Sequence, residues 1–441
     1  MLFEQLIIYG AVLLFCVSVV YFYLKKEKKA SNIVKAKIER AKRFGLHEPA
    51  SLHPRIDLNT CIKSASCVSN CPEQDILGIL DGGGTLINAS NCVGHGACFH
   101  SCPVEAISLV IGTEKRGMEL PHLNEFYESN IKGIYIAGEL GGMGLIKNSV
   151  EQGQLAVDNI VKQGLKKGSS GYDIIIVGAG PAGISASLTA KKHGLKFLTL
   201  EQDSLGGSVY NYPRSKIVMT TYMDLPLHGK AKLNGASKAE LLDLWYAVLS
   251  KNDITVHEQT KVDSIQPDGN GFKVCTAKGD EYWTQKVLLA IGRRGSPRKL
   301  NIPGEQLEKV AYRLLEPERI AEKKIVVVGG GDSAVEAALM LADENEVHIS
   351  YRKFAFSRIR HENRERLNYA VGKGKLKVIY NSNLVKIETD KVHLKTVAGE
   401  DMTLENDLVY IFAGGEMPMQ FLKKTGVRIS KRFGYTMRKY G

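Results

Sequence analysis

YDIIIVGAGPAG, residues 172–183, is the stretch that decides the fold of this 441-residue chain. Its apolar first half predicts a short buried strand, and its glycines fall at the G-x-G-x-x-G spacing of Gly178, Gly180 and Gly183. A helix is expected next, and a second apolar strand ends at Glu201. Glycines let backbone approach a pyrophosphate, and an acidic residue at that distance accepts hydrogen bonds from ribose hydroxyls. The pattern predicts a dinucleotide-binding domain.

A second glycine-rich loop of the same kind follows the strand expected in KIVVVGGGDSA, residues 324–334. Its pattern positions are Gly329, Gly331 and Ala334. The next expected strand ends before Arg352 and Lys353, and no carboxylate stands where a ribose 2′-hydroxyl would need one. The two basic residues could pair with a 2′-phosphate, which favours NADPH over NADH. The alternative is an ordinary basic strand end.

A third stretch, GIYIAGELGGMGLIKNSVEQG, occupies residues 133–153. It predicts a strand over 134–137, a turn at Gly138 and Glu139, and a helix from about Asn148. A buried strand that runs through glycines into a helix presents backbone N–H groups to a ligand.

Together with the loop around Gly207, these stretches resemble the thioredoxin-reductase-like FAD flavoproteins of the pyridine nucleotide-disulfide oxidoreductase superfamily. The resemblance implies that Gly138, Glu139, Glu201 and Gly207 contact FAD. In that family the segment like 133–153 lies near the C-terminus, whereas here it precedes the first nucleotide loop. The chain therefore looks circularly permuted, and this segment is expected to dock beside the strand at 174–177.

Two cysteine runs share one template, in which Cys-x5-Cys-x3-Cys-Pro occurs twice, 31 residues apart. The first run is Cys61, Cys67 and Cys71, and the second is Cys92, Cys98 and Cys102. The runs resemble those of dicluster ferredoxins, C-x2-C-x2-C-x3-C-P, in which the fourth cysteine serves the other cluster. Ser64 and His95 stand where that template has its second cysteine.

The ferredoxin resemblance implies two iron–sulfur clusters of the 4Fe-4S or 3Fe-4S type. One would be held by Cys61, Cys67, Cys102 and Ser64. The other would be held by Cys92, Cys98, Cys71 and His95. A zinc site is the alternative for the Cys3His set, and a ferredoxin-like module without clusters is the other.

Residues 5–24 are uncharged and largely apolar, which is enough to cross a hydrocarbon core of ~30 Å. The lysines that follow predict a single-pass helix with the catalytic body on the cytoplasmic side. A secretory signal peptide fits less well, because a basic start and a small-residue cleavage site are both missing. The basic helix expected over 31–44 either lies on anionic headgroups or is a solvated spacer.

The net charge of +12 is concentrated in residues 25–43 and 417–441, so no nucleic-acid groove is expected in the body. The predicted fold class is α/β, with two Rossmann-like domains, a small α+β ferredoxin-like module and one N-terminal transmembrane helix. The predicted segments are a transmembrane helix (1–24), a basic juxtamembrane segment (25–50), the iron–sulfur module (51–113), the permuted flavin segment with a tether (114–170), the FAD domain (171–295), the NAD(P)H domain (296–415) and a basic tail (416–441).

These features predict a membrane-anchored oxidoreductase that takes electrons from NAD(P)H through FAD to iron–sulfur centres and a quinone or carrier. Hydride transfer needs no acid or base, so no catalytic residue is assigned. A Cys-x-x-Cys pair is missing before Gly329, which argues against dithiol exchange. One alternative is a reductase of a low-molecular-weight thiol disulfide, and another is a membrane-tethered redox sensor. The flavoprotein resemblance also implies a homodimer.

Overall fold

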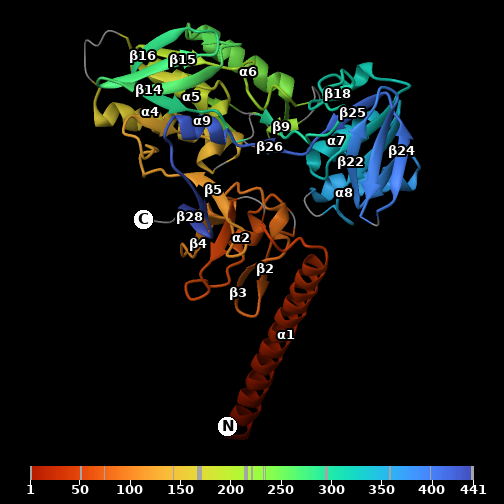
Figure 1. Ribbon diagram of the computed structural model, residues 1–441. Coiled ribbons are helices and arrows are strands. Elements are labelled where there is room, and N and C mark those ends of the chain that lie inside the picture. The colour runs from red at the N-terminus through yellow and green to blue at the C-terminus, as the bar shows by residue number, and fades with distance from the viewer. Residues whose placement is uncertain are drawn as a thin grey trace. The chain divides into compact units, whose positions relative to one another are not determined.

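The computed structural model describes the whole chain except residues 1, 50–51, 74, 143, 166–170, 213–216, 220–221, 232, 234, 294–295, 357–358, 398 and 439–441. It consists of two compact units, which we describe separately (Figure 1). Unit 1 contains residues 1–116 and 433–441, and unit 2 contains residues 117–432. Most of the predicted tether, residues 166–170, lies outside the described residues.

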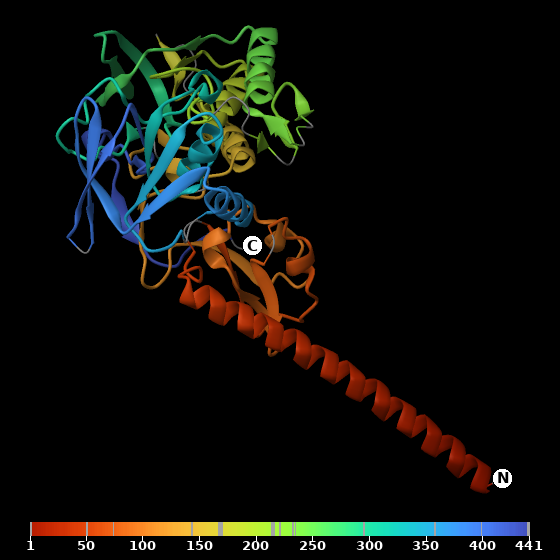
Figure 2. The same cartoon turned by 90° about the vertical axis from the view of Figure 1, so that its right-hand side faces the viewer.

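Unit 1 begins with one long helix, α1 (Leu2–Arg43), which Figure 2 shows in full. The apolar stretch that predicts a membrane span and the basic stretch after it form this single helix without a break. Its apolar part is long enough to cross a membrane and is not buried by other described residues.

The rest of unit 1 is a small α+β module. Its sheet has the order β1 (His53–Ile56), β4 (Ile107–Ile111) and β28 (Tyr435–Arg438), with antiparallel pairing throughout. A hairpin pairs β2 (Leu77–Leu80) with β3 (Gly83–Leu86). Two one-turn helices, α2 (Ser66–Ser69) and α3 (Ala97–His100), and the turn η1 (Ala89–Asn91) complete the module.

The part of unit 2 that contains the first predicted nucleotide-binding domain is built on a seven-stranded sheet. The strand order is β13 (Val256–His257), β8 (Phe197–Leu200), β7 (Tyr172–Val177), β16 (Glu281–Leu289), β15 (Gly271–Thr276) and β14 (Val262–Asp268), with β6 (Ile134–Ile136) also paired to β16. Its helices are η2 (Glu139–Gly141), α4 (Ile146–Gln163), α5 (Pro181–Lys192) and α6 (Lys238–Lys251). Short pairs join β9 (Ile217–Met219) to β12 (Ala236–Ser237) and β10 (Met223–Leu225) to β11 (Gly229–Ala231).

The permuted segment does enter this sheet, but the expected neighbour was wrong. Strand β6 pairs in parallel with the second half of β16, with Ile134 opposite Val287 and Ile136 opposite Leu289. Strand β7, at 172–177, lies on the other side of β16. The physical reason is that β15 pairs only with the first half of β16, which leaves the edge of the second half open to β6.

Helix α4, which follows this strand, packs closely against α5. A Cβ atom placed on Gly153 would lie only 2.1 Å from the backbone oxygen of Ala182, so only glycine allows this approach. The inner face of α4 joins a shared core with β6, β7 and α5. Its fully buried members include Ala156, Val157, Ile160, Ile174 and Ile176.

The second predicted nucleotide-binding domain has a parallel five-stranded sheet. Its order is β18 (Val310–Ala311), β25 (Leu408–Ile411), β19 (Lys324–Val328), β20 (Glu346–Tyr351) and β21 (Leu376–Tyr380). A separate antiparallel sheet follows β21 along the chain. It consists of β22 (Ser382–Ile387), β23 (Lys391–Thr396) and β24 (Asp401–Glu405). The helices are η3 (Pro317–Arg319), α7 (Asp332–Leu341) and α8 (His361–Gly372), and β17 (Ser296–Pro297) pairs with β26 (Gly415–Glu416).

The C-terminal segment, predicted as a basic tail, is folded over most of its length. Helix α9 (Met419–Lys424) places Leu422 in the core of the first nucleotide-binding domain, and Val427 joins the same core. Strand β27 (Ile429–Arg432) pairs with β5 (Met118–Pro121). Strand β28 then completes the sheet of unit 1. These long-range pairings have no local sequence signal, and the basic residues occupy their exposed positions and ends.

The helix contact at Gly153 gives the first prediction. Gly153→Ala should lower the free energy of unfolding by about 1–3 kcal/mol, because its methyl group overlaps the Ala182 backbone oxygen. Thermal unfolding followed by far-UV circular dichroism would measure the change. Leu155→Ala is the matched control, because Leu155 lies on the exposed face of the same helix. Equal stability of the two variants would contradict the docked position of α4.

Candidate cofactor sites

The first glycine loop is tight on one side and open on the other. A Cβ atom on Gly183 would lie 1.8 Å from the Gly178 oxygen, so helix α5 starts directly against the end of β7. A Cβ atom on Gly180 would meet no atom within 4 Å. The loop therefore offers its backbone to a ligand at Gly180, as a pyrophosphate-binding loop requires.

Glu201 lies at the end of β8 with its carboxylate turned toward this loop. The backbone N–H groups of Ala179 and Asp203 donate to it at 2.6 Å and 3.0 Å. Burial raises the pKa of Glu201, and these N–H groups lower it. The side chain is thus held at the position where the sequence places the acceptor for ribose hydroxyls.

Two segments that are distant in sequence from each other meet at this loop. A Cβ atom on Gly207 would lie 3.4 Å from the Gly180 Cα atom. Gly138 reaches the first turn of α5 and donates its N–H to Gln152 Oε1 at 2.8 Å. Glu139 follows directly, as the first residue of η2.

A buried polar atom beside the loop also fits a ligand. Asn211 donates its side-chain N–H to the Gly207 oxygen, while its Oδ1 atom has no hydrogen-bond partner among the described residues. Buried polar atoms are normally paired, so a hydroxyl or ring N–H of a bound flavin would satisfy this oxygen. The residues present therefore fit FAD.

The second glycine loop has the same construction. A Cβ atom on Gly329 would lie 2.6 Å from the Phe412 oxygen and 3.0 Å from the Ala334 Cβ, whereas one on Gly331 would meet nothing within 4 Å. Arg352 and Lys353 follow β20 and are exposed, as an approach by a phosphate would need.

Tyr351, the last residue of β20, was missed by the sequence analysis. Its ring stacks on Phe356 with a centroid separation of 4.8 Å and covers Gly330, where a Cβ atom would lie 1.9 Å from the ring. The sequence signal that could have indicated this contact is Gly330, the central glycine of the GGG triplet. Only a residue without a side chain fits beneath an aromatic ring at that distance.

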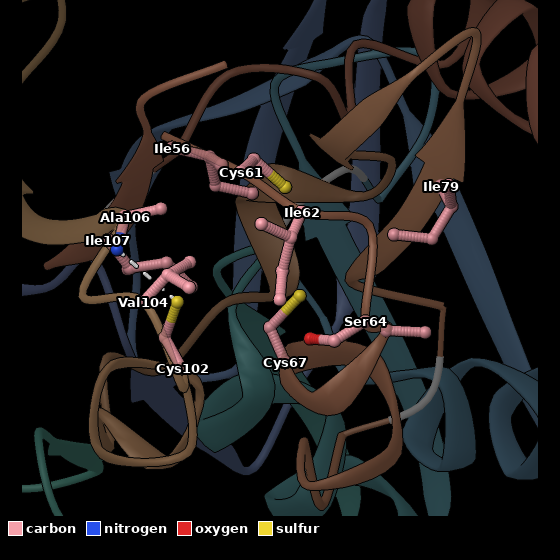
Figure 3. A pocket seen from close by; sticks show the side chains of 11 residues that line it. Ile56, Cys61, Ile62, Ser64, Cys67, Ile79, Cys102, Val104, Ala106 and Ile107 are labelled. Atoms are coloured by element: carbon pink, nitrogen blue, oxygen red, sulfur yellow. Dashed lines mark hydrogen bonds between the residues drawn. The ribbon is translucent and has the colours of Figure 1, made fainter. Parts of the chain in front are cut away.

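The first cysteine site is a small hollow that is partly open to solvent. Cys61, Ser64, Cys67 and Cys102 line it, as Figure 3 shows. Its remaining wall is apolar and consists of Ile56, Ile62, Ala65, Ile79, Val104, Ala106 and Ile107. The backbone N–H of Ala106 donates to the Cys102 sulfur at 3.3 Å, the kind of contact that tunes bound clusters.

The second cysteine site brings together Cys71, Cys92 and Cys98. Burial, together with the neighbouring thiols, raises the pKa of the Cys92 thiol to about 11 and that of the Cys98 thiol to about 12. Burial likewise raises the pKa of Cys67, with contributions from Cys61 and Cys102. The structure thus gathers the cysteines in the two crossed groups that the ferredoxin resemblance implies.

The two sites have the same local backbone. Ala65 and Gly96, 31 residues apart, both adopt left-handed conformations, with φ of 56° and 77°, immediately before α2 and α3. Each one-turn helix then carries the central cysteine of its run on its second residue. The repeated spacing in the sequence therefore corresponds to a repeated structure.

His95 lies beside the second site, with Nε2 4.0 Å from the Cys71 sulfur. Its Nδ1 atom accepts the Ala97 N–H at 3.1 Å, so in the neutral ring the proton belongs on Nε2. In this arrangement His95 can donate toward Cys71. To bind an iron, Nε2 would have to lose its proton; a neutral ring would then carry the proton on Nδ1 and lose its contact with the Ala97 N–H.

The chemistry of the donor atoms fits iron–sulfur clusters. Three thiols, those of Cys61, Cys67 and Cys102, line the first hollow. Thiolates are the ligands that iron–sulfur clusters take.

Comparisons with known proteins agree with both parts of the chain. The family described as pyridine nucleotide-disulphide oxidoreductase matches residues 175–437. A second family, described as a 4Fe-4S dicluster domain, matches residues 53–103.

Individual relatives match mainly the nucleotide-binding part. A ferredoxin–NADP reductase of Ignicoccus hospitalis is 34% identical over 185 residues, 42% of this chain and 57% of that protein. The bacilliredoxin reductase Bdr of Bacillus subtilis is 29% identical over 266 residues, 59% of this chain and 82% of that protein. The solved bacillithiol disulfide reductase of Staphylococcus aureus is 27% identical, with a TM-score of 0.52, and the match covers 59% of this chain and 81% of that one. The chain spans little more than half the length of the first relative.

The crossed grouping of cysteines gives the second prediction. Cys102→Ala should remove the iron of the first site and keep that of the second, although Cys102 belongs to the second run. Cys71→Ala should do the reverse. Each should lower iron by about half and remove a different EPR signal. Cys275→Ala is the control, because Cys275 lies on β15 in unit 2. Loss of the same signal in both variants would contradict the crossed assignment.

Proposed function

The chain belongs to the pyridine nucleotide-disulphide oxidoreductase family, and we propose that it is a membrane-anchored NAD(P)H-dependent flavin oxidoreductase whose electrons leave through iron–sulfur centres. The observation that carries the proposal is the presence of two built sites in one chain: the glycine loop at Gly178–Gly183 and the cysteine hollow around Cys61. The acceptor we propose is a quinone.

The residues of the first loop suit the binding of FAD. The Gly180 backbone would face the pyrophosphate and Glu201 the adenosine ribose, while Gly138 and Glu139 lie where the flavin end would pass. When bound, FAD accepts electrons in pairs and can release them singly, and iron–sulfur clusters carry one electron each. The protein supplies orientation and exclusion of water, so no side chain needs to act as acid or base.

The balance of the proposed reaction is NADPH, one proton and a quinone giving NADP⁺ and a quinol. The nicotinamide loses a hydride, and the quinone gains two electrons and two protons. One of those protons comes from the hydride's own hydrogen after it is released to solvent, and the other comes directly from solvent.

The membrane part of the proposal rests on α1. Its apolar stretch is followed by Lys25, Lys26, Lys28 and Lys29, a distribution that retains the following domain in the cytoplasm. A reductase in that compartment would have access to NADPH.

A second candidate is a reductase of a low-molecular-weight thiol disulfide. The relatives from B. subtilis and S. aureus favour it, since each match covers more than four-fifths of the relative. This second candidate gives the cysteine module no role, whereas reduction of a quinone through iron–sulfur centres does.

Metal analysis and acceptor assays separate these functions. Protein purified without oxygen should contain iron, sulfide and flavin, with several irons per flavin. In proteoliposomes, NADPH oxidation should be faster with a quinone than with a thiol disulfide. Protein that contains flavin but no iron, and that reduces thiol disulfides rapidly, would contradict the proposal and support the second candidate.

Arg352 gives a prediction for the choice of nucleotide. Arg352→Ala should raise the KM for NADPH roughly tenfold or more and leave that for NADH nearly unchanged, because a charged contact to the 2′-phosphate is lost. Steady-state kinetics with a dye acceptor would measure it. Lys373→Ala, an exposed basic residue after α8, is the control. Equal effects on both nucleotides would contradict the assignment.

A further inference from the structure

We propose that residues 58–64, the bilayer-facing loop, insert Leu58 and Ile62 into the membrane surface, so that electrons leave the protein at the first cysteine site and reduce a quinone dissolved in the bilayer. This inference rests on the proposed function. It adds the exit site and the surface by which that site meets its substrate.

The loop is held beside α1 by contacts within unit 1. Lys63 Nζ lies 3.9 Å from Glu27 Oε1. The turn of the β2–β3 hairpin is held next to it, because Ser31 Oγ donates to Asp81 Oδ1 at 2.7 Å. A Cβ atom on Gly82, in the same turn, would lie 3.4 Å from Lys63. The loop and the hairpin turn therefore reach toward the apolar part of α1.

Two further contacts fix the direction of the module along the helix. A Cβ atom on Gly78 would touch Val34, and Lys37 pairs with Asp75 at 2.5 Å. The segment that contains the hairpin thus contacts α1 between Lys37 and Ser31. The bilayer-facing loop contacts α1 one turn nearer its N-terminus, at Glu27. A continuous helix with four successive contacts sets the height of the loop above the membrane.

That height falls in the headgroup layer. Glu27 is three residues beyond Leu24, the end of the apolar stretch, or about 4.5 Å at the helical rise per residue. The polar layer on each side of the hydrocarbon core is about 5–7 Å thick. Lys63, which contacts Glu27, therefore lies within that layer.

The loop presents apolar side chains at this height. Leu58 is 63% exposed and Ile62 is 61% exposed. Apolar side chains next to a lysine suit the boundary between headgroups and acyl chains, where the apolar part is buried and the amine reaches phosphates. The occupant is the membrane that holds α1, because the loop is continuous with that anchor through its contacts.

Ile62 connects this surface to the cysteine site. It lines the first hollow together with Cys61 and Ser64, and it is also exposed (Figure 3). The wall between that hollow and the surface is thus formed by a side chain at the level of the headgroups. The first cysteine site, rather than the second, would be the one from which an electron crosses to a lipid-soluble acceptor.

The quinone is the chemical class that completes the electron balance there. It takes two electrons, delivered one at a time, and two protons from the aqueous side of the headgroup layer. The electrons are those that NADPH gives up as a hydride, so no further reductant is needed.

Tryptophan quenching by brominated lipids tests the insertion directly. The full-length protein with Leu58→Trp would be placed in vesicles of phosphatidylcholine with or without bromine on the acyl chains. The parent protein would supply the background of Trp245 and Trp283. We expect the added fluorescence to fall by about half or more, because bromine quenches only at short range in the acyl region.

Phe44→Trp is the matched control. Phe44 is 44% exposed and lies 20 residues beyond Leu24, about 30 Å along the axis of α1, so the fluorescence added there should be unaffected by bromine. Equal quenching in the two variants, or none in Leu58→Trp, overturns the insertion. Added fluorescence in Leu58→Trp that is shielded from iodide but not quenched by bromine would indicate a protein partner and likewise overturns it.

A polar substitution tests the consequence for the substrate. Leu58→Gln should lower the rate with a long-tailed quinone in proteoliposomes about tenfold, whereas the rate with a water-soluble short-tailed quinone should change less than twofold. Unchanged iron and flavin content would show that the variant is loaded normally. Equal loss with both quinones overturns the inference.

Different results would overturn the proposed function and the inferred exit site. Reduction of the long-tailed quinone by the parent protein, together with no bromine quenching in Leu58→Trp, overturns this inference and leaves the proposed function intact. If NADPH drives the reduction of neither quinone, the proposed function fails, and the inferred exit site fails with it, whatever the quenching shows.

Discussion

The parallel pairing of β6 with the second half of β16 is the constraint on which the rest of the structure depends. It brings the chain that leaves the cysteine module into the centre of the flavin sheet, where the Ala137 N–H donates to the Leu289 oxygen. Gly138 and Glu139 then fall at the carboxyl end of that sheet, beside the glycine loop. In an open parallel sheet this is the edge at which ligands bind.

The glycine loops, the cysteine repeat and the long apolar helix could be predicted from the sequence, because each is encoded within a few dozen residues. The pattern around Gly178 and the repeat ending at Cys102 require only local spacing. The neighbour of β6 could not be predicted, since it depends on where β15 stops pairing with β16. The pairing of β28 with β4 joins residues more than 300 positions apart, and nothing in the basic C-terminal sequence indicates it.

Burial raises the pKa of thiols and of a carboxylate alike in this chain, but the groups around them differ. Burial raises the pKa values of Cys92 and Cys98, so these groups remain protonated near neutral pH unless a cation compensates their charge. Bound iron would supply that compensation, and its binding would be coupled to the loss of thiol protons. For Glu201, two backbone N–H groups offset part of the effect of burial on the pKa. The cost of burying a negative charge would thus be offset by iron in unit 1, and it is partly offset by backbone hydrogen bonds in unit 2.

The most direct test of electron flow between the two parts is an anaerobic titration with NADPH, followed by visible absorption and EPR on the same samples. Flavin absorbance should fall, and iron–sulfur EPR signals should change in step with it, with more electrons taken up per protein than FAD alone can hold. Uptake of only two electrons, with iron present and its EPR spectrum unchanged, would contradict the account.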